Sequence, residues 1–275
     1  MIFTDEAKAL YLLEKIGYYR LSGYWYPLLA DKEKHTFKPD ANFETVFSLY
    51  KFDRELRKLV NAEIEKIEVA IRVKMAYELS MAYHLFWIED ASLFSSSHNH
   101  LATLDKINEE YMRSNEEFII AFKNKYSDPL PPACIILEIT SFGTLSRLYR
   151  NLKPSKAKRD IAKSFALPDI VFDSWLHSLA CVRNRCAHHT RLWNSLIKIQ
   201  PLSPRRPQRT WLENNTTCSN RIYYVFSMII YLLNEINPNH TFKQKLEELF
   251  AKYPNVDRAA MGFPPAWQNE PLWAK

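Results

Sequence analysis

Residues 52–79, FDRELRKLVNAEIEKIEVAIRVKMAYEL, decide the fold. Apolar side chains recur there at spacings of three and four, which predicts one buried face on a long α-helix. The surrounding segment, residues 40–128, contains no proline, so no such helix breaker interrupts it. Two acid–base pairs, Asp53–Arg57 and Glu68–Arg72, have the four-residue spacing and the orientation that stabilise a helix. The apolar face comprises Phe52, Leu56, Leu59, Val60, Ile64, Ile67, Ile71, Met75 and Leu79.

Similar patterns predict helices along most of the chain. We expect them over residues 111–126, 135–149, 221–236 and 241–253, and over a stretch that begins at Pro168-Asp169. That last stretch presents an apolar face of Trp175, Leu176, Leu179 and Val182.

The remaining segments connect and cover these helices. Residues 153–159 form a basic linker or a helix start, and the Pro- and Arg-rich residues 201–207 form a loop. The tail, residues 262–273, carries three aromatic side chains that are costly to leave in water, so we expect an ordered strap. No repeat or clear boundary divides the chain. The sequence therefore predicts a single all-α domain over residues 1–275, a helical bundle with peripheral helices and an ordered C-terminal strap.

Composition excludes several classes of protein. The 275 residues are 47% hydrophobic and 14% aromatic, enough for a sizeable core and too apolar for a disordered chain. Only 4 glycines against 15 prolines argue against Gly-rich barrels, sandwiches and dinucleotide folds. The net charge of +6 permits a polyanionic partner without requiring one.

The cysteines and the apolar runs bear on location. Four cysteines are too few for a disulfide scaffold in a chain of this length. The N-terminal residues lack the pattern of a signal peptide. The longest apolar run, residues 223–233, is far shorter than the roughly 20 residues of a membrane span. We expect a cytoplasmic protein with no membrane partner.

Residues 181–194, CVRNRCAHHTRLWN, are the segment that carries chemistry, within a motif-bearing region of about 168–200. They contain three arginines, two histidines and two asparagines, whereas a solvated helix face normally carries Glu and Lys. One interpretation is a helix end whose cationic side chains cap carbonyl groups. A zinc site is disfavoured, because Cys181 and Cys186 lack the usual ligand spacing. A Cys186 nucleophile is disfavoured as well, because no oxyanion-hole signature accompanies it.

Ribonuclease chemistry is the fourth interpretation. RNA cleavage without a metal needs a base for the 2′-hydroxyl proton, an acid for the leaving 5′-oxygen and a fixed cation for the charge that grows on the phosphoryl group. Imidazole titrates near neutral pH, and guanidinium stays charged and binds phosphate oxygens in pairs. An Arg and a His at this spacing are common by chance, so the surrounding residues must decide.

The surrounding residues resemble a known family. Arg183-Asn184-x-x-x-His188 is similar to the R-x4–6-H motif of HEPN ribonucleases, and the wider string through Asn194 resembles their abortive-infection (AbiD/AbiF-like) branch. Three further segments resemble the same family in the same order, so the resemblance covers nearly the whole chain. These segments are residues 18–27 (YYRLSGYWYP), residues 131–146 with its SFGTLS ending, and residues 261–267 (MGFPPAW).

The resemblance implies a HEPN-type bundle and a homodimeric, metal-independent endoribonuclease without a cofactor. Its members act as toxins or in anti-phage defence, and a small structured RNA antitoxin is an expected partner. His188 would then be the general acid/base, Arg183 the phosphate clamp and Asn184 an orienting or phosphate-donating residue. Arg183 and His188 should lie at a helix end and line one basic cleft shared across a two-fold axis. A tyrosine-modifying antitoxin is disfavoured, because position 190 is Thr.

Helix geometry gives separate support for a composite site. Five residues turn through about 500°, which places two such side chains roughly 140° apart on one straight helix. We therefore expect either a backbone break near Cys186–Ala187 or a site built from two chains. Candidate RNA-binding residues are His189, Arg185, Arg191, Lys156 and Arg159.

Several of these residues have a structural alternative. His189 is favoured as a core or cap histidine, and Arg191 and Asn194 as makers of structural hydrogen bonds. The Glu68–Arg72 pair is favoured as an exposed ion pair, although some HEPN proteins place an early-helix acid near the motif arginine. Residues 18–26 are favoured as core over a surface that stacks on bases. The alternative function is a non-catalytic RNA-binding or scaffold protein.

Overall fold

A helix of 40 residues, α3 (Phe43–Ala82), forms the axis of the molecule and is about 60 Å long. The computed structural model describes residues 1–214 and 217–274. The Asn42 side chain starts the helix by accepting a hydrogen bond from the backbone N–H of Glu44 at 2.7 Å. The helix predicted from residues 52–79 is confirmed, and every side chain of its apolar face except the half-buried Leu59 is buried.

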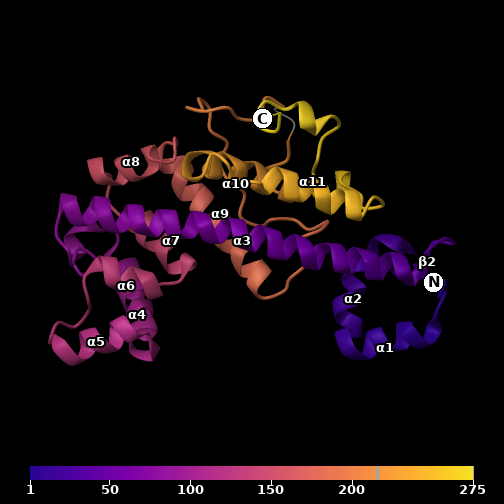
Figure 1. Cartoon of the computed structure of the whole chain (residues 1–275), viewed down its shortest axis with the longest axis horizontal. Helices are drawn as coiled ribbons and strands as arrows, with labels where there is room; N and C mark the ends of the chain where they lie inside the picture. Colours follow the sequence, from indigo (N-terminus) through magenta and orange to yellow (C-terminus); the bar gives the residue numbers. More distant parts are fainter. Residues whose placement is uncertain (215–216, 275) are drawn as a thin grey trace.

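Helices from the whole chain pack on α3, as Figure 1 shows. The helices of residues 97–163 gather near its C-terminal end, those of residues 169–252 lie along its middle, and α1 (Glu6–Ile16) lies near its N-terminal end. The helices in contact with α3 are α2 (Tyr18–Trp25), α6 (Ala133–Ile139), α8 (Lys156–Lys163), α9 (Asp169–Ala187), α10 (Ile222–Ile236) and α11 (Phe242–Lys252). The others are α4 (Ser97–Arg113), α5 (Glu117–Lys125) and α7 (Phe142–Asn151).

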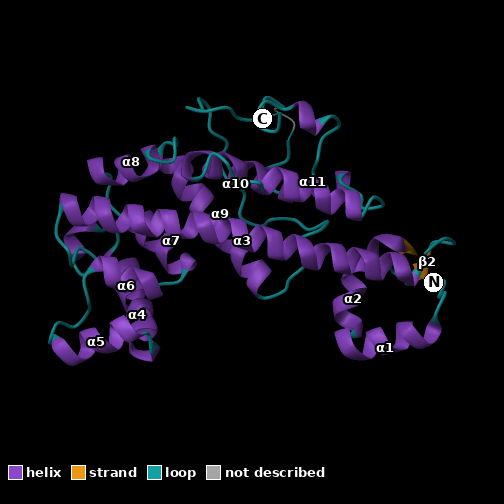
Figure 2. Ribbon diagram, viewed as in Figure 1, coloured by secondary structure: helices purple, strands orange, loops and turns teal. Residues whose placement is uncertain are grey.

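The all-α prediction is confirmed in the described residues. Figure 2 shows helices almost throughout, with one short hairpin of β1 (Leu29–Asp31) and β2 (Thr36–Phe37) that the sequence analysis did not predict. The buried side chains form one continuous cluster that runs from Ala9 in α1 to Trp273 in the tail. No helix in the described part of the chain combines the length and apolarity needed to cross a membrane.

Two predicted helices are each divided in the structure. Residues 111–126 contain the end of α4 and all of α5, because Ser114 is extended and its hydroxyl accepts from the Glu116 N–H at 3.4 Å. Residues 135–149 are divided between α6 and α7. There the Ser141 hydroxyl accepts from the Thr144 N–H and starts a new helix. Local side-chain caps therefore override the continuous apolar pattern.

The C-terminal strap is ordered, as predicted. Phe263, Trp267 and Trp273 are all buried, and the Trp273 indole donates to the Ser227 hydroxyl of α10 at 3.0 Å. The strap turns at Gly262, which has φ +90°, and a Cβ there would lie 2.4 Å from the Cβ of Arg221. Only glycine satisfies both constraints at this position.

The buried carboxylate of Asp53 in α3 forms hydrogen bonds both with α2 and with the loop that follows α9. Its Oδ1 accepts from the backbone N–H groups of Leu192 (3.0 Å) and Trp193 (2.7 Å). Its Oδ2 accepts from the Tyr24 hydroxyl (2.6 Å) and from Arg57. Burial raises the pKa of Asp53, and the hydrogen bonds and the Arg57 charge oppose that rise. The predicted helix-supporting pair is thus the centre of a buried network.

Asp53→Ala should strongly destabilise the protein. The substitution leaves Arg57 as a buried, unpaired charge and removes the acceptor of two backbone N–H groups, a change that costs about 3–5 kcal/mol in buried pairs. Urea unfolding followed by circular dichroism measures the loss. The matched control is Asp160→Ala, which removes an exposed i,i+4 pair with Lys156 and should change little. Equal effects of the two variants would show that the network does not hold the fold.

Candidate functional site

The Arg/His segment lies where α9 ends. The His189 backbone is left-handed (φ 57°), and two hydrogen bonds close the helix end: His189 N–H to the Cys186 carbonyl (3.1 Å) and Thr190 N–H to the Arg185 carbonyl (2.8 Å). This pair of bonds is a Schellman motif. The backbone break expected near Cys186–Ala187 is not found, because α9 is continuous through Ala187. The left-handed residue comes only at His189, after both Arg183 and His188. It turns the chain so that His188 and His189 face different cavities.

His188 faces the larger of the two cavities, which has a volume of about 780 Å³ and is called the His188 cavity below. Asn184 lines the same cavity from the preceding helical turn, and both residues are exposed. The loop that follows α9 closes the other side with Arg191, Asn194 and Lys198. The structure thus brings together two of the three predicted catalytic residues.

Arg183 lines neither of the two cavities and contacts an acid of α3. Its Nε lies 3.6 Å from Oε2 of Glu68, and the Arg72 guanidinium donates to the other Glu68 oxygen at 2.8 Å. Arg72 also donates to the Thr140 carbonyl at 3.0 Å. The prediction of an exposed Glu68–Arg72 pair is wrong, because α6 and α9 pack over it and leave the two residues 7% and 8% exposed. An early-helix acid does contact the motif arginine.

Arg185 and Arg191 shape the loop that bounds the His188 cavity. Arg185 donates to the carbonyls of Leu196 (2.9 Å) and Arg191 (2.8 Å), and burial lowers its pKa. Arg191 packs over Gly23 of α2, with its Nη1 3.6 Å from the position of a Cβ there. Asn194 has a left-handed backbone and accepts from Arg221 at 3.4 Å. Arg185 thus has a structural role in addition to its predicted RNA contact.

His189 faces a second cavity of about 460 Å³, called the His189 cavity below. Its side chain is exposed, so the prediction of a core or cap histidine is wrong for the imidazole; only its backbone takes part in the cap. The Arg20 guanidinium donates to the His189 carbonyl at 3.2 Å. The other cationic side chains of this cavity are Arg54, Arg57 and Lys58 of α3, and no sequence motif marks them as a site.

Residues 18–26 divide between the two predicted roles. Leu21, Tyr24 and Trp25 are buried, whereas Tyr18, Tyr19 and Tyr26 are exposed. The segment is therefore core on one face of α2 and open to solvent on the other.

Lys156 and Arg159 lie on α8, away from the two cavities. Helix α8 precedes the N-terminal end of α9, and the motif is at the other end of that 19-residue helix, about 27 Å away. Lys156 is paired with Asp160 at 2.8 Å. An RNA contact of these two residues would require a strand that extends along the whole of α9.

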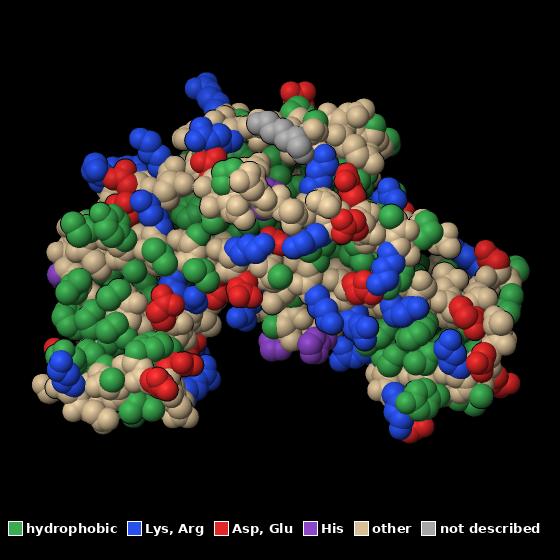
Figure 3. Space-filling view, in the orientation of Figure 1, with side chains coloured by type: hydrophobic (Ala, Val, Ile, Leu, Met, Phe, Trp, Pro, Cys, Tyr) green, Lys and Arg blue, Asp and Glu red, His purple; other side chains and the backbone are tan. Residues whose placement is uncertain are grey.

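Figure 3 shows the face that carries the motif. The surface is concave between the helices α4 to α6 on one side and α1 and α2 on the other. Histidine, Lys and Arg side chains gather at the deepest part of this concave surface. This surface has the shape and charge to receive an anionic strand.

The two cysteines of the motif are poorly suited to nucleophilic chemistry. Burial raises the pKa of Cys186 to about 12 and also raises the pKa of Cys181. Because the thiolate is the reactive form, both thiols are weak nucleophiles at neutral pH. Within the ranges that the structure covers, no three His, Cys, Asp or Glu side chains are grouped so that they could hold a metal ion.

Fold and site together define a class of protein, an all-α bundle with an Arg/His segment at the end of an inner helix. A family model described as Abi-like protein matches residues 11–194, from α1 through the loop after α9. The chain therefore belongs to the Abi-like protein family, which is associated with abortive infection and phage defence. No curated protein and no solved structure is similar enough to match it.

Thiol labelling should separate the cysteines by burial. Cys134 and Cys218 are exposed and should react rapidly with Ellman's reagent at pH 8, whereas Cys186 should react only as fast as the site opens. Cys134→Ser/Cys218→Ser, the control, should lose the rapid phase and keep the slow one. A rapidly labelled Cys186 would contradict the buried, neutral thiol described above.

Proposed function

We propose that this protein is an endoribonuclease that cleaves RNA by attack of the 2′-hydroxyl, with His188 as general acid/base. The observation that carries the proposal is the exposed His188 at a helix end, facing a cavity that Asn184 also lines. An exposed imidazole beside an amide, with Arg191 nearby, provides a proton-transfer group and donors for phosphate oxygens. The HEPN resemblance of Arg183-Asn184-x-x-x-His188 supports the same reaction.

Arg183 is the proposed clamp for the charge that develops on the phosphoryl group. Glu68 lies 3.6 Å from its Nε, and neither of its two Nη groups forms a hydrogen bond with a described residue. Those groups are therefore available to an anion, in the paired geometry that suits phosphate. Glu68 would act as a positioning residue that fixes the direction of the guanidinium.

A homodimer resolves the separation of Arg183 from His188. Within one chain Arg183 contacts α3, whereas His188 faces the cavity on the side of the 191–199 loop. In a two-fold dimer, Arg183 of one protomer can meet His188 of the other. We also propose that a small structured RNA acts as antitoxin, from the family resemblance alone.

A non-catalytic RNA-binding protein is the second candidate. The same separation favours it, because a cavity with His188 and without Arg183 can hold RNA without cutting it. Chemistry distinguishes the two candidates, since binding alone leaves no new RNA ends.

Cleavage should depend on the 2′-hydroxyl and on His188. We expect products with 2′,3′-cyclic phosphate and 5′-hydroxyl ends, activity in the presence of a chelator, and no cutting of an RNA with 2′-deoxy at the scissile nucleotide. His188→Ala should lose about 10²–10⁴-fold in rate, the usual contribution of general acid–base catalysis. The matched variant His189→Gly keeps the left-handed backbone and should lose much less. Equal cutting of the RNA and its 2′-deoxy counterpart would contradict the proposal.

A mixing experiment tests the two-chain site. Arg183→Ala and His188→Ala should each be inactive alone. If each site takes Arg183 from one protomer and His188 from the other, a mixed dimer regains one intact site. An equal, fully exchanged mixture should then show about a quarter of the wild-type activity. Mixtures that stay inactive, although light scattering confirms subunit exchange, would place each site within a single chain.

A further inference from the structure

The His189 cavity collects positive charge from two separate helices. Arg20 comes from α2, and Arg54 and Lys58 come from α3, while His189 lines the cavity from the loop after α9. No Asp or Glu is among the residues that line the cavity. Its volume, about 460 Å³, falls in the range of small-ligand sites.

The protein neutralises only part of the positive charge on this cavity. Arg57 is paired with Asp53. Arg54 and Lys58 are exposed and form neither a hydrogen bond nor a close ion pair with any described residue. The acid next to them on α3, Glu55, interacts electrostatically with Arg54, but it accepts its hydrogen bonds from Lys252 at 2.8 Å and from the Tyr253 hydroxyl at 2.8 Å. The cavity therefore keeps the positive charge of Arg20, Arg54 and Lys58.

This arrangement is unfavourable unless an anion binds. Arg54 and Lys58 are four residues apart on one helix, and like charges at that spacing destabilise a helix. A bound phosphate would receive hydrogen bonds from this cluster and remove the repulsion.

The position of the cavity indicates which anion this is. The His188 and His189 cavities lie on either side of the same turn, and their two histidines are consecutive, with Cα atoms about 3.8 Å apart. A strand bound at His188 therefore passes within reach of the His189 cavity, where another phosphate of the same strand can bind. Tyr50 and Asn61 also line the cavity. The Tyr50 ring already stacks on Phe47, whereas the Asn61 amide can form hydrogen bonds with the adjoining nucleoside.

We propose that the His189 cavity is a second phosphate subsite, which binds a backbone phosphate of the RNA strand beside the one at His188. The assignment rests on the proposed function for the identity of the strand. Arg54 and Lys58 bind the phosphate, and Arg20 both adds charge and fixes the turn through the His189 carbonyl.

Salt-dependent binding tests the subsite without relying on cleavage. The probe is a 2′-O-methyl RNA oligonucleotide, which cannot be cut by 2′-hydroxyl attack, and binding is measured by fluorescence anisotropy. For Arg54→Gln/Lys58→Gln we expect weaker binding and a slope of log affinity against log salt that is less steep by about 1.4, from about 0.7 for each lost contact to a single strand.

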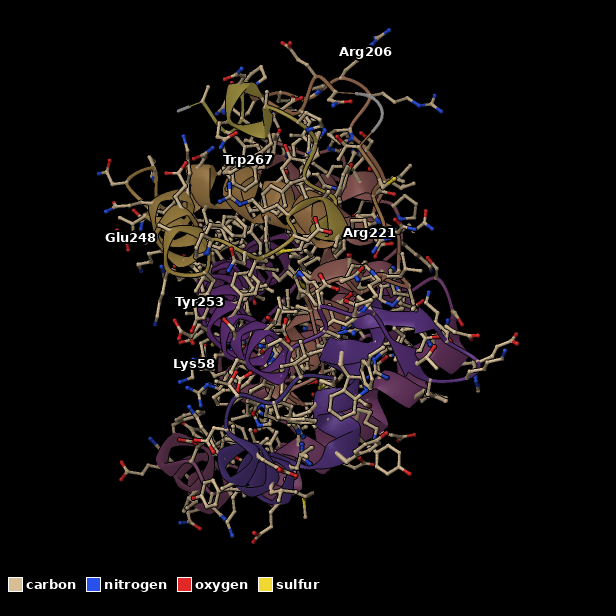
Figure 4. The ribbon with its side chains drawn as sticks, turned by 90° about the vertical axis from the view of Figure 1, so that its right-hand side faces the viewer. Lys58, Arg206, Arg221, Glu248, Tyr253 and Trp267 are labelled. Carbon is tan, nitrogen blue, oxygen red and sulfur yellow. The ribbon has the colours of Figure 1, made fainter. Side chains whose placement is uncertain are left out.

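The matched control removes two charges elsewhere. Figure 4 shows Arg206 at the top of the view, well above Lys58. Arg205→Gln/Arg206→Gln makes the same charge change in an exposed loop. This control should leave the slope nearly unchanged. Equal slopes for both double variants and the wild type, or equal losses in both variants, would overturn the subsite.

Thermal melting gives an independent readout. In phosphate-free buffer Arg54→Gln/Lys58→Gln should melt at the same temperature as the wild type or slightly higher, because repulsion is relieved. Inorganic phosphate should raise the Tm of the wild type more than that of the variant. A clearly lower Tm of the variant without phosphate would show that the two cations stabilise the fold instead, and would overturn the proposal.

Three further outcomes separate this proposal from the nuclease proposal and from a small-molecule site. Tight binding of the oligonucleotide through Arg54 and Lys58, with no cutting of unmodified RNA, would support the subsite and contradict the nuclease. If unmodified RNA is cut and the Arg54→Gln/Lys58→Gln variant binds the oligonucleotide as the wild type does, the nuclease is supported and the subsite is contradicted. If free AMP binds as tightly as the oligonucleotide, the cavity is a small-molecule site and the strand subsite is wrong.

Discussion

The buried carboxylate of Asp53 is the interaction on which the site depends. It accepts backbone hydrogen bonds from Leu192 and Trp193, residues about 140 positions away in the chain, and so fixes the loop after α9 against α3. Arg57 and the Tyr24 hydroxyl complete its hydrogen bonds, and burial raises the pKa of Tyr24, which keeps the donor protonated. A buried polar group is stable only when it is fully paired, so this geometry has little freedom.

A second constraint, the left-handed backbone at His189, determines the directions in which the two histidine side chains of this loop point. One residue in this conformation ends α9 and sends two consecutive histidines into different cavities. The turn therefore converts a compact sequence motif into two separate surfaces. On one of them the imidazole of His188 lies beside Asn184, and on the other the imidazole of His189 lies among cations of α2 and α3.

The sequence predicted the main helices because their apolar spacing survives in the core. The 52–79 pattern and the start of α9 at Asp169 are both found in the structure. What it could not predict depends on contacts between distant segments. Asp53–Arg57 and Glu68–Arg72 have the spacing of surface ion pairs, and only the packing of α2, α6, α9 and the 192–193 loop makes them buried. The contact of Arg20 with the His189 carbonyl could not be predicted for the same reason, although Arg20 lies in residues 18–27, one of the segments that resemble the family.

Helix α3 shows why fold and site cannot be separated in this molecule. Within sixteen residues it supplies Asp53 to hold the motif loop, Arg54 and Lys58 to charge the His189 cavity, and Glu68 to contact Arg183. Because these side chains project from one rigid helix, their spacing is fixed before any ligand binds. A substitution that shifts α3 therefore moves both cavities and the motif arginine together. A substitution of an exposed α3 cation, in contrast, changes mainly the charge of one cavity. Arg54 and Lys58 can therefore report on binding, whereas a substitution of the buried Asp53 also disturbs the fold.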